Sequence, residues 1–433
     1  MMTWSQGSPT LHEELSSDGG SSDTGEGGSG GDTSTADCMA ASHDNVECDD
    51  DGLCTITGDS DDPVVDDLTL TNDCEYLLGG PVFIGDDEDE TVLEIEAGTT
   101  IYGVEETYMV IQRSSKIIAD GTESDPIVFT SLGDEDGNKA TGDWGGLVIN
   151  GRAPINLGDE AAGEADSGTY GGDDPEDDSG VLHYVRVEFA GNQVDAENEL
   201  NGIAFQGVGS GTEVDYVQIH YNQDDGMEFF GGTVSGKHIM ITGAGDDGFD
   251  WTNGWSGNVQ FVYVEAYEGG GERGVEADNQ ETDFSAEPVS DPTLSNFTLV
   301  GVEDNEVGMK LRRGTHASIN NFVVANFPAG CLSIDDPDDT EVEFNNTIIA
   351  CDTSFVEDGD STETEDTFNA GDNNAEIDVG DLGVDDSWVP EADSPLLGVG
   401  DSPDEDFFDS VDYAGAFDEG EDWREGWTTL DNE

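Results

Sequence analysis

The stretch DDGMEF at residues 224–229 returns as DDGFDW at 246–251, ERGVEA at 272–277 and EVGMKL at 306–311. Each copy has two leading positions, a glycine, and then an alternation of apolar, charged and apolar residues. Self-similarity of this kind indicates a solenoid, in which each repeat buries its apolar face against its neighbours.

The spacing of the copies predicts the type of solenoid. Equivalent apolar positions lie 22, 26, 34 and 22 residues apart, at Met227, Phe249, Val275, Met309 and Cys331. A β-rich run precedes each copy, and helical periodicity is nearly absent. Two or three short strands per repeat are typical of a parallel β-helix, whereas β-sandwiches show two-residue hairpin turns. We therefore expect an all-β, right-handed parallel β-helix with loops extruded at residues 265–274 and 278–291.

A second periodic feature is a series of asparagines. Asn296, Asn321 and Asn346 stand 25 residues apart, each directly before a strand-like run. Stacked amides form hydrogen-bonded ladders, and asparagine tolerates the left-handed backbone that a corner between strands requires. We interpret this series as structural.

Composition along the chain suggests four parts. We expect a disordered, acidic, Gly/Ser-rich linker at 1–37 and a cysteine-containing N-terminal cap at 38–75. The β-helix is expected at 76–355, and an acidic C-terminal segment at 356–433 is expected to fold back as a cap. An open solenoid end exposes core and strand edges, so both ends need covering.

The charge of the chain excludes several partners. Lys and Arg total 11 against 102 Asp and Glu, for a net charge of −91. Nucleic-acid binding needs a basic footprint, which is absent. No run approaches the length of a transmembrane span, so we expect no direct membrane insertion. Strong self-repulsion is screened by salt, which favours a salt-adapted, halophilic protein.

The cysteines and the N-terminus bear on location. The six cysteines are even in number and lack paired metal-ligand spacing, which favours disulfides in an oxidising compartment over a zinc site. The first 15 residues show neither the basic nor the apolar part of an export signal. The linker that follows is typical of a surface tether, so we expect an extracellular or cell-surface location.

Four stretches carry a family resemblance: GDWGGLVINGRAPIN at 142–156, and residues 181–191, 200–232 and 412–428. They resemble secreted, lipoprotein-type proteins of environmental bacteria that belong to the pectin-lyase-like superfamily. The resemblance implies a right-handed parallel β-helix and an extracellular location, but no established activity. The chain departs from that pattern because no signal peptide is visible.

In register, the repeats predict columns of carboxylates about 4.8 Å apart. One column holds Glu228, Asp250 and Glu276; the others are Asp224, Asp246 and Glu272, and Asp225 with Asp247. Like charges at this spacing raise each other's pKa or bind a cation. Oxygen-only ligands suit Ca²⁺. The alternative is that a salt-adapted surface carries stacked acids without a metal.

Basic residues and aromatics extend this hypothesis. Arg273 falls in the column of Asp247, and Lys310 falls in that of Glu276. The layout resembles polysaccharide lyases, in which Ca²⁺ neutralises a uronate carboxylate and Arg or Lys removes a proton; simple ion pairing is the alternative. Trp255 and Tyr267, on or near the extruded loops, are candidates for stacking on sugar rings, although isolated surface aromatics are common.

The sequence therefore predicts a divalent-cation-stabilised protein that binds extracellular polysaccharide or has a structural or adhesive role at the surface. The alternative is an enzyme. A calcium-dependent lyase would hold Ca²⁺ on the Glu228 column and use Arg273 or Lys310 as base. A glycosidase would need two carboxylates about 5–9.5 Å apart in a cleft.

Overall fold

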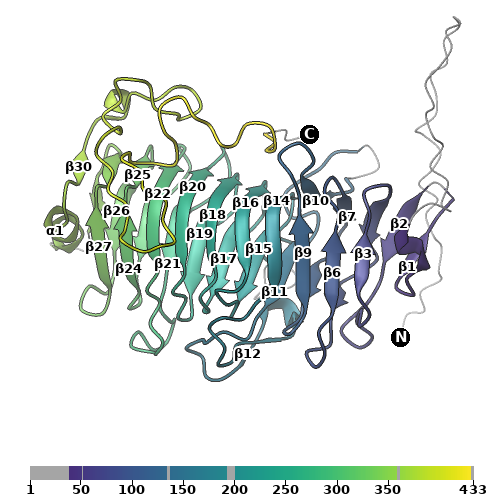
Figure 1. Ribbon diagram of the computed structural model, residues 1–433. Coiled ribbons are helices and arrows are strands. Elements are labelled where there is room, and N and C mark those ends of the chain that lie inside the picture. Colours follow the sequence, from purple (N-terminus) through teal and green to yellow (C-terminus); the bar gives the residue numbers. More distant parts are fainter. Residues whose placement is uncertain (1–38, 51, 134–136, 193–199, 358–360, 431–433) are drawn as a thin grey trace, which may run out of the picture.

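The computed structural model describes residues 39–430 except 51, 134–136, 193–199 and 358–360. The linker expected at 1–37 lies outside these residues. Strands stack one after another along a single axis, in the order of the sequence for most of its length (Figure 1). Neighbouring coils pair in parallel, so the predicted parallel β-helix is confirmed.

Each coil has three walls. The first two walls share an 18-stranded sheet and the third is a 10-stranded sheet. The third wall comprises β5 (Val82–Ile84), β8 (Met109–Ile111), β11 (Leu147–Asn150), β15 (Ile203–Gln206), β17 (Met227–Phe230), β19 (Asp247–Thr252), β21 (Arg273–Ala277), β23 (Val307–Leu311), β26 (Gly330–Ile334) and β29 (Phe355–Val356).

In the larger sheet, the middle strands turn from the first wall to the second, and the outer coils have a separate strand on each wall. The turning strands are β14 (Gly180–Glu188), β16 (Glu213–His220), β18 (Ser235–Thr242), β20 (Asn258–Glu265) and β22 (Thr293–Val300). The outer ones are β1 (Val46–Cys48), β2 (Leu53–Ile56), β3 (Leu68–Leu70), β4 (Glu75–Leu78), β6 (Val92–Ile95), β7 (Thr100–Gly103), β9 (Lys116–Asp120), β10 (Ile127–Ser131), β24 (His316–Asn320), β25 (Val323–Ala325), β27 (Glu341–Asn345), β28 (Ile348–Ala350) and β30 (Ala375–Glu376).

The core consists of stacked apolar columns inside the coil. Met227, Phe249, Val275 and Met309 are paired in register, and all four are fully buried. Strand residues alternate between the two faces of a sheet, so the charged residue that follows each of them faces outward. The inward and outward alternation predicted from the repeated phrase is therefore confirmed.

The corner between the first two walls is a ladder of left-handed residues. Asn296, Asn321 and Asn346 have φ values of 61°, 57° and 50°. Asn321 donates to Ser295 Oγ at 3.1 Å, and Asn373 donates to Asn346 Oδ1 at 3.0 Å. In earlier coils aromatic residues with positive φ occupy the same corner: Tyr184, Tyr216, His238 and Phe261. Their rings stack where the later coils use amides.

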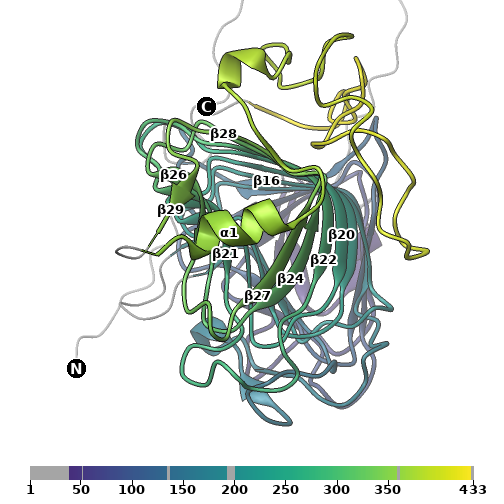
Figure 2. The ribbon, with the colours of Figure 1, turned by 90° about the vertical axis from the view of Figure 1, so that its left-hand side faces the viewer.

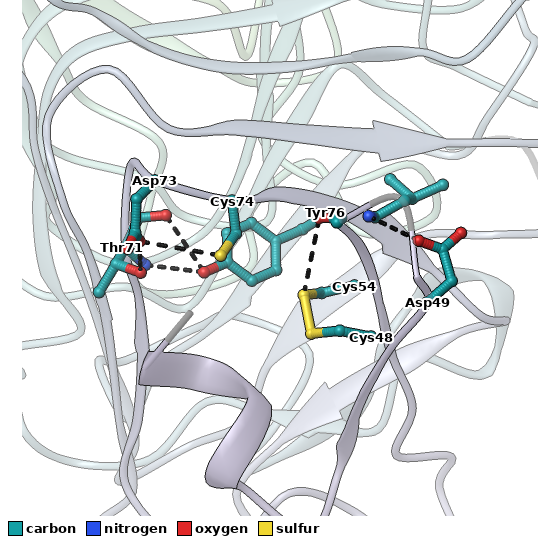
Figure 3. Close-up of a disulfide and its surroundings, with 9 residues drawn as sticks. Cys48, Asp49, Cys54, Thr71, Asp73, Cys74 and Tyr76 are labelled. Atoms are coloured by element: carbon teal, nitrogen blue, oxygen red, sulfur yellow. Dashed lines mark hydrogen bonds between the residues drawn. A yellow bond between two sulfur atoms is a disulfide. The ribbon is translucent and has the colours of Figure 1, made fainter. Parts of the chain in front are cut away.

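The N-terminal end is closed by a short unit that includes the 3₁₀ helix η1 (Met39–Ser42) and the antiparallel pair β1–β2. A disulfide joins Cys48 to Cys54 (Figure 3). The Tyr76 hydroxyl points away from this disulfide, toward Thr71, whose N–H it accepts at 2.8 Å. Because β2 already pairs in parallel with β4, the coils begin before the expected boundary at residue 76. The alternating strands at 53–56 and 68–70 were too short to be recognised in the sequence.

The remaining cysteines also form bonds. Cys331 is joined to Cys351, and Cys74 is disulfide-bonded too. No cysteine is free in the described part of the chain. The disulfides predicted from the even cysteine count are confirmed.

The C-terminal part does more than cap the end. The helix α1 (Glu363–Ala370) lies across the end of the coils (Figure 2), where Phe368 packs against Phe344 and Phe355. This helix was not expected, since only two of its side chains are buried and its apolar pattern is weak. The coils continue to β30, past the expected limit at 355, and a 3₁₀ helix, η3 (Val379–Asp381), follows.

Residues 401–430, here called the return segment, do not cover the open end but run back along the flank of the larger sheet (Figure 1). Gln218 donates to the Thr429 carbonyl at 2.6 Å, and Asn296 donates to that of Tyr413 at 2.9 Å. Trp427 sets its edge against Tyr184 and Tyr216. The aromatic corner offers a large apolar surface, which explains this placement. No helix among the described residues is long and apolar enough to cross a membrane.

We expect Asn321→Ala to lower the free energy of unfolding by about 1 kcal/mol, because it removes two part-buried hydrogen bonds to the return segment. The Asn321 amide accepts the Asp401 N–H at 3.0 Å and donates to the Asp401 carbonyl at 3.2 Å. The measurement is denaturant unfolding. As a control, Asn321→Gly keeps the left-handed backbone accessible. An equal stability of Asn321→Ala and the wild type would contradict the role of the ladder.

Candidate functional site

The outward column of the third wall changes character along the axis. The strands place Val148, Ala204, Glu228, Asp250 and Glu276 opposite one another in consecutive coils, followed by Lys310. The predicted alignment of Glu228, Asp250 and Glu276 is confirmed as a geometric fact. The column is apolar on its N-terminal side, charged from Glu228 to Lys310, and uncharged again at Ser333 and Val356.

A long connection explains the apolar part. Residues 151–180, between β11 and β14, form the hairpin β12 (Ala161–Ala162) and β13 (Thr169–Tyr170) and the 3₁₀ turn η2 (Glu164–Asp166). Their side chains Ile155 and Tyr170 belong to a buried cluster with Val148, Ala204 and Phe230 on the outside of the wall. The column becomes acidic beyond this covered area.

Beyond that cover, carboxylates form three overlapping groups. Within each group the oxygen atoms lie within 4.8 Å of one another. The groups are Asp224, Asp225 and Asp246; Asp225, Glu228 and Asp250; and Asp247, Asp250 and Glu276. We call these seven residues the carboxylate ladder. Glu272, expected in the same array, is exposed and bonds to Arg273 instead.

The C-terminal side of the ladder is neutralised by arginines. The Arg273 guanidinium lies 3.1 Å from Asp247 Oδ2 and 2.9 Å from Glu276 Oε1. Arg312 contacts the other oxygen of Glu276 and also binds Asp278 at 2.8 Å. These buried acids therefore have positive partners, as a charge removed from water requires.

The N-terminal side has no such partner. Among the described residues, no ion pair involves Asp225, Glu228 or Asp250. Asp225 is 6% exposed, and its Oδ1 accepts the Asp247 N–H at 2.9 Å. Glu228 Oε2 accepts from Asn201 at 2.7 Å. Asp250 Oδ1 is buried without any hydrogen-bond partner in the described chain. Buried acceptors without donors are rare in proteins and need an explanation.

The surroundings of these groups change their protonation. Burial, followed by the charge of Asp250, raises the pKa of Asp225 and of Glu228 well above the ordinary value. Burial and the charge of Glu276 do the same for the pKa of Asp250. Burial also raises the pKa of Asp247, even though Arg273 opposes the change. Both low dielectric and like charge penalise the ionised form.

Two asparagines at the ladder were missed by sequence reasoning. Asn201 and Asn222 are 2% and 0% exposed, and the Oδ1 atom of each lacks a hydrogen-bond partner among the described residues. Asn222 donates to the Asp225 carbonyl at 2.6 Å. The sequence did contain a signal: NGIAFQ at 201–206 pairs in register with the phrase at 225–230, with Asn201 in place of the acid.

The two basic residues proposed as candidate bases, Lys310 and Arg273, form ion pairs with carboxylates. Lys310 follows Glu276 in the column, but its ammonium lies 2.6 Å from Asp335 Oδ2. Arg273 is bound by four carboxylates, those of Asp247, Glu272, Glu276 and Glu306. Neighbouring negative charges outweigh burial and raise the pKa of Arg273. Both side chains thus lie in ion pairs with carboxylates.

The aromatic candidates differ from the expectation. Trp255 is fully buried and stacks on Phe229 with ring centroids 4.3 Å apart, so it is a core residue and cannot contact a ligand. The connection that carries it turns inward over the coil. Tyr267 stays partly exposed, but it packs against Tyr221 and His220. Burial raises the pKa of Tyr267 to about 12.

Comparison with known families supports the architecture. A family model described as a pectate-lyase-like β-helix domain matches residues 62–389, which is 328 of the 433 residues. The chain belongs to this family. The residues matched to the pectate-lyase-like β-helix domain include the whole carboxylate ladder and end before the return segment. No curated protein and no solved structure matches the chain.

The pH dependence of stability tests the state of the ladder in this pectate-lyase-like domain. The folded-state pKa values of Asp225, Glu228 and Asp250 lie above the ordinary values of 3.8 and 4.5. The folded state therefore binds more protons, and the free energy of unfolding rises as pH falls from the raised values toward about 4. We expect the melting temperature in chelator to rise between about pH 7 and pH 5.

Asp250→Asn should flatten this pH profile, because the amide is neutral throughout. The other acids of the chain also repel one another less at low pH, so the comparison needs a control. Glu343→Gln, at an exposed position on β27, removes one charge without touching the ladder. Equal slopes for Asp250→Asn and Glu343→Gln would show that the ladder does not bind the extra protons.

Proposed function

We propose that this protein is an extracellular, calcium-stabilised β-helix that binds polysaccharide through the wall carrying the carboxylate ladder. The membership in a pectate-lyase-like family fits a polysaccharide-related role. The main support for a cation is the group formed by Asp225, Glu228 and Asp250. Their oxygens converge, and none of the three has a positive partner among the described residues.

Within the ladder, we assign the cation to these three residues. Asp247 and Glu276 are already bound by Arg273, and Glu276 is also bound by Arg312. A second positive charge there would meet two guanidinium groups. Ca²⁺ takes six to eight oxygen ligands in flexible geometry. Three carboxylates and the buried Oδ1 atoms of Asn201 and Asn222 supply oxygens of the required kind.

The ion would supply a positive charge to which an acidic sugar can bind. The residues around it define the rest of the surface: the covering segment 151–180 on one side and the arginine cluster on the other. The disulfides favour an oxidising location, and the net charge of −91 favours a saline one. A structural or adhesive role at the cell surface is compatible with the same binding wall.

Ion pairing favours binding over lyase chemistry. A base must release its proton before it can accept another, and carboxylates raise the pKa of Arg273. Lys310 lies in an ion pair with Asp335. The glycosidase alternative needs a cleft at the paired acids. Two hollows among the described residues, near Cys351 and near Phe83, are not lined by these acids.

The cation proposal predicts stabilisation by calcium. At constant ionic strength, Ca²⁺ at about 100 times its Kd should add about 2.7 kcal/mol to the free energy of unfolding. Thermal melting with CaCl₂ against matched NaCl measures this. Asp250→Asn and Glu228→Gln should lose most of the shift, while Glu343→Gln should keep it. No shift for the wild type at millimolar Ca²⁺ would remove the cation from the proposal.

The enzyme alternative has its own test. Cleavage of uronate polymers by a lyase creates an unsaturated product that absorbs in the ultraviolet. We expect no increase in absorbance with polygalacturonate or alginate in the presence of Ca²⁺, because the two candidate bases, Arg273 and Lys310, are paired with carboxylates. A steady increase that is lost in Arg273→Gln or Lys310→Gln would instead establish the lyase and assign its base.

A further inference from the structure

A hollow of about 400 Å³ lies on the third wall, at its N-terminal end, and its size is typical of pockets for small ligands. Phe83 of β5 and Gln112, which follows β8, line it. Asp61 also lines it, together with Asp166 and Thr169 of the covering segment.

The Asp166 side of the hollow has a strained backbone. Ala165 and Asp166 are consecutive residues with φ values of 51° and 58°. Each non-glycine residue in this region costs of the order of 1 kcal/mol, and such strain persists only where the surroundings impose it. Backbone strain beside a pocket is typical of functional sites, because the strained conformation holds a side chain in a position that a relaxed backbone would not allow.

Three side chains from the wall hold this strained turn. The Tyr108 hydroxyl donates to the Ala165 carbonyl at 3.2 Å. Asn150 and Gln112 both donate to the Ser167 carbonyl, at 2.8 and 3.2 Å. Asn150 is fully buried, and Gln112 is 8% exposed. The side of the hollow is therefore fixed before any ligand arrives, which lowers the entropic cost of binding.

The hollow presents hydrogen-bond acceptors. Asp61, Asp86 and Asp166 line it, and no ion pair in the described chain involves them. The nearest guanidinium groups are already committed: Arg113 and Arg152 both bind Asp87, at 2.9 and 2.6 Å, and Arg113 also binds Glu160. The N–H groups of Glu88 and Asp89 lower the pKa of Asp86, which keeps its carboxylate ionised.

We propose that this hollow is a subsite for an uncharged sugar unit, whose hydroxyl groups donate to the carboxylates of Asp61, Asp86 and Asp166. Hydrogen bonds from hydroxyls to carboxylates are short and strong. A uronate or sulfated sugar would bring a like charge into the same space. The proposal rests on the polysaccharide role above, but it concerns a different place and a different sugar chemistry.

The two places are separate along the wall. β8 and β17 are three strand spacings apart, which is about 14 Å. One sugar unit cannot contact both the hollow and the cation position of the ladder, so the two sites can be tested independently.

The test is isothermal titration of the full chain at constant salt with cellohexaose, xylohexaose and mannohexaose, and with the hexamers of galacturonate and glucosamine. We expect at least one neutral hexamer to bind. Asp166→Asn and Asp61→Asn should each weaken it about tenfold, since an amide is a poorer acceptor and keeps the shape. Asp62→Asn, next to the hollow but outside it, and Glu343→Gln, at an exposed position on β27 away from both sites, should leave the affinity unchanged.

Several outcomes overturn the proposal: no neutral hexamer binds, the pocket variants bind as the wild type does, or only the glucosamine hexamer shows binding that depends on Asp166. Galacturonate binding that is lost in Asp250→Asn, without any neutral binding, would retain the ladder and reject the hollow. Binding of a neutral hexamer that depends on Asp166, without any effect of Ca²⁺, would retain the hollow and reject the cation at the ladder. Thermal melting of each variant confirms that it is folded.

Discussion

The parallel register between consecutive coils is the constraint on which the rest of the molecule depends. Backbone hydrogen bonds fix each strand about 4.8 Å from its neighbour, so every position repeats as a column along the axis. Insertions of different length between coils leave this register intact, as the pairing of Asp250 with Glu276 and of Glu276 with Lys310 shows. The apolar core, the corner ladder and the carboxylate ladder are three consequences of one geometry.

The same geometry makes ionisation of the acidic wall energetically unfavourable. Carboxylates stacked at this spacing and partly buried cannot all remain ionised without compensation. A guanidinium, a proton or a bound cation can each provide it. Arg273 and Arg312 do so around Glu276. Asp250 itself has no ion pair among the described residues, so a proton is the partner that its raised pKa favours. A cation bound there, as proposed, would compete with that proton, and its binding would therefore depend on pH.

The fold and the alignment of the carboxylates could be predicted from the sequence, because the repeat spacing of a solenoid determines which residues of successive coils pair. The spacing from Met227 to Phe249 and onward is sufficient to align the carboxylates. Contacts between segments far apart in sequence were not accessible in this way. The burial of Trp255 depends on how its connection folds over the coil, and the pairing of Lys310 with Asp335 depends on a rotamer. The path of the return segment depends on an aromatic corner that only stacking creates.

The covering segment 151–180 decides which parts of the third wall can meet a ligand. Its apolar residues occupy the wall over Val148 and Ala204, where the outward column has no charge to offer. Among the described residues, polar positions lie on either side of it: the acceptor-lined hollow toward the N-terminus and the carboxylate ladder toward the C-terminus. The carboxylates of the hollow would repel an acidic sugar, whereas a cation on the ladder would attract one. A polymer that spans both would therefore have to alternate uncharged and acidic units, a requirement that a uniform polyuronate does not meet.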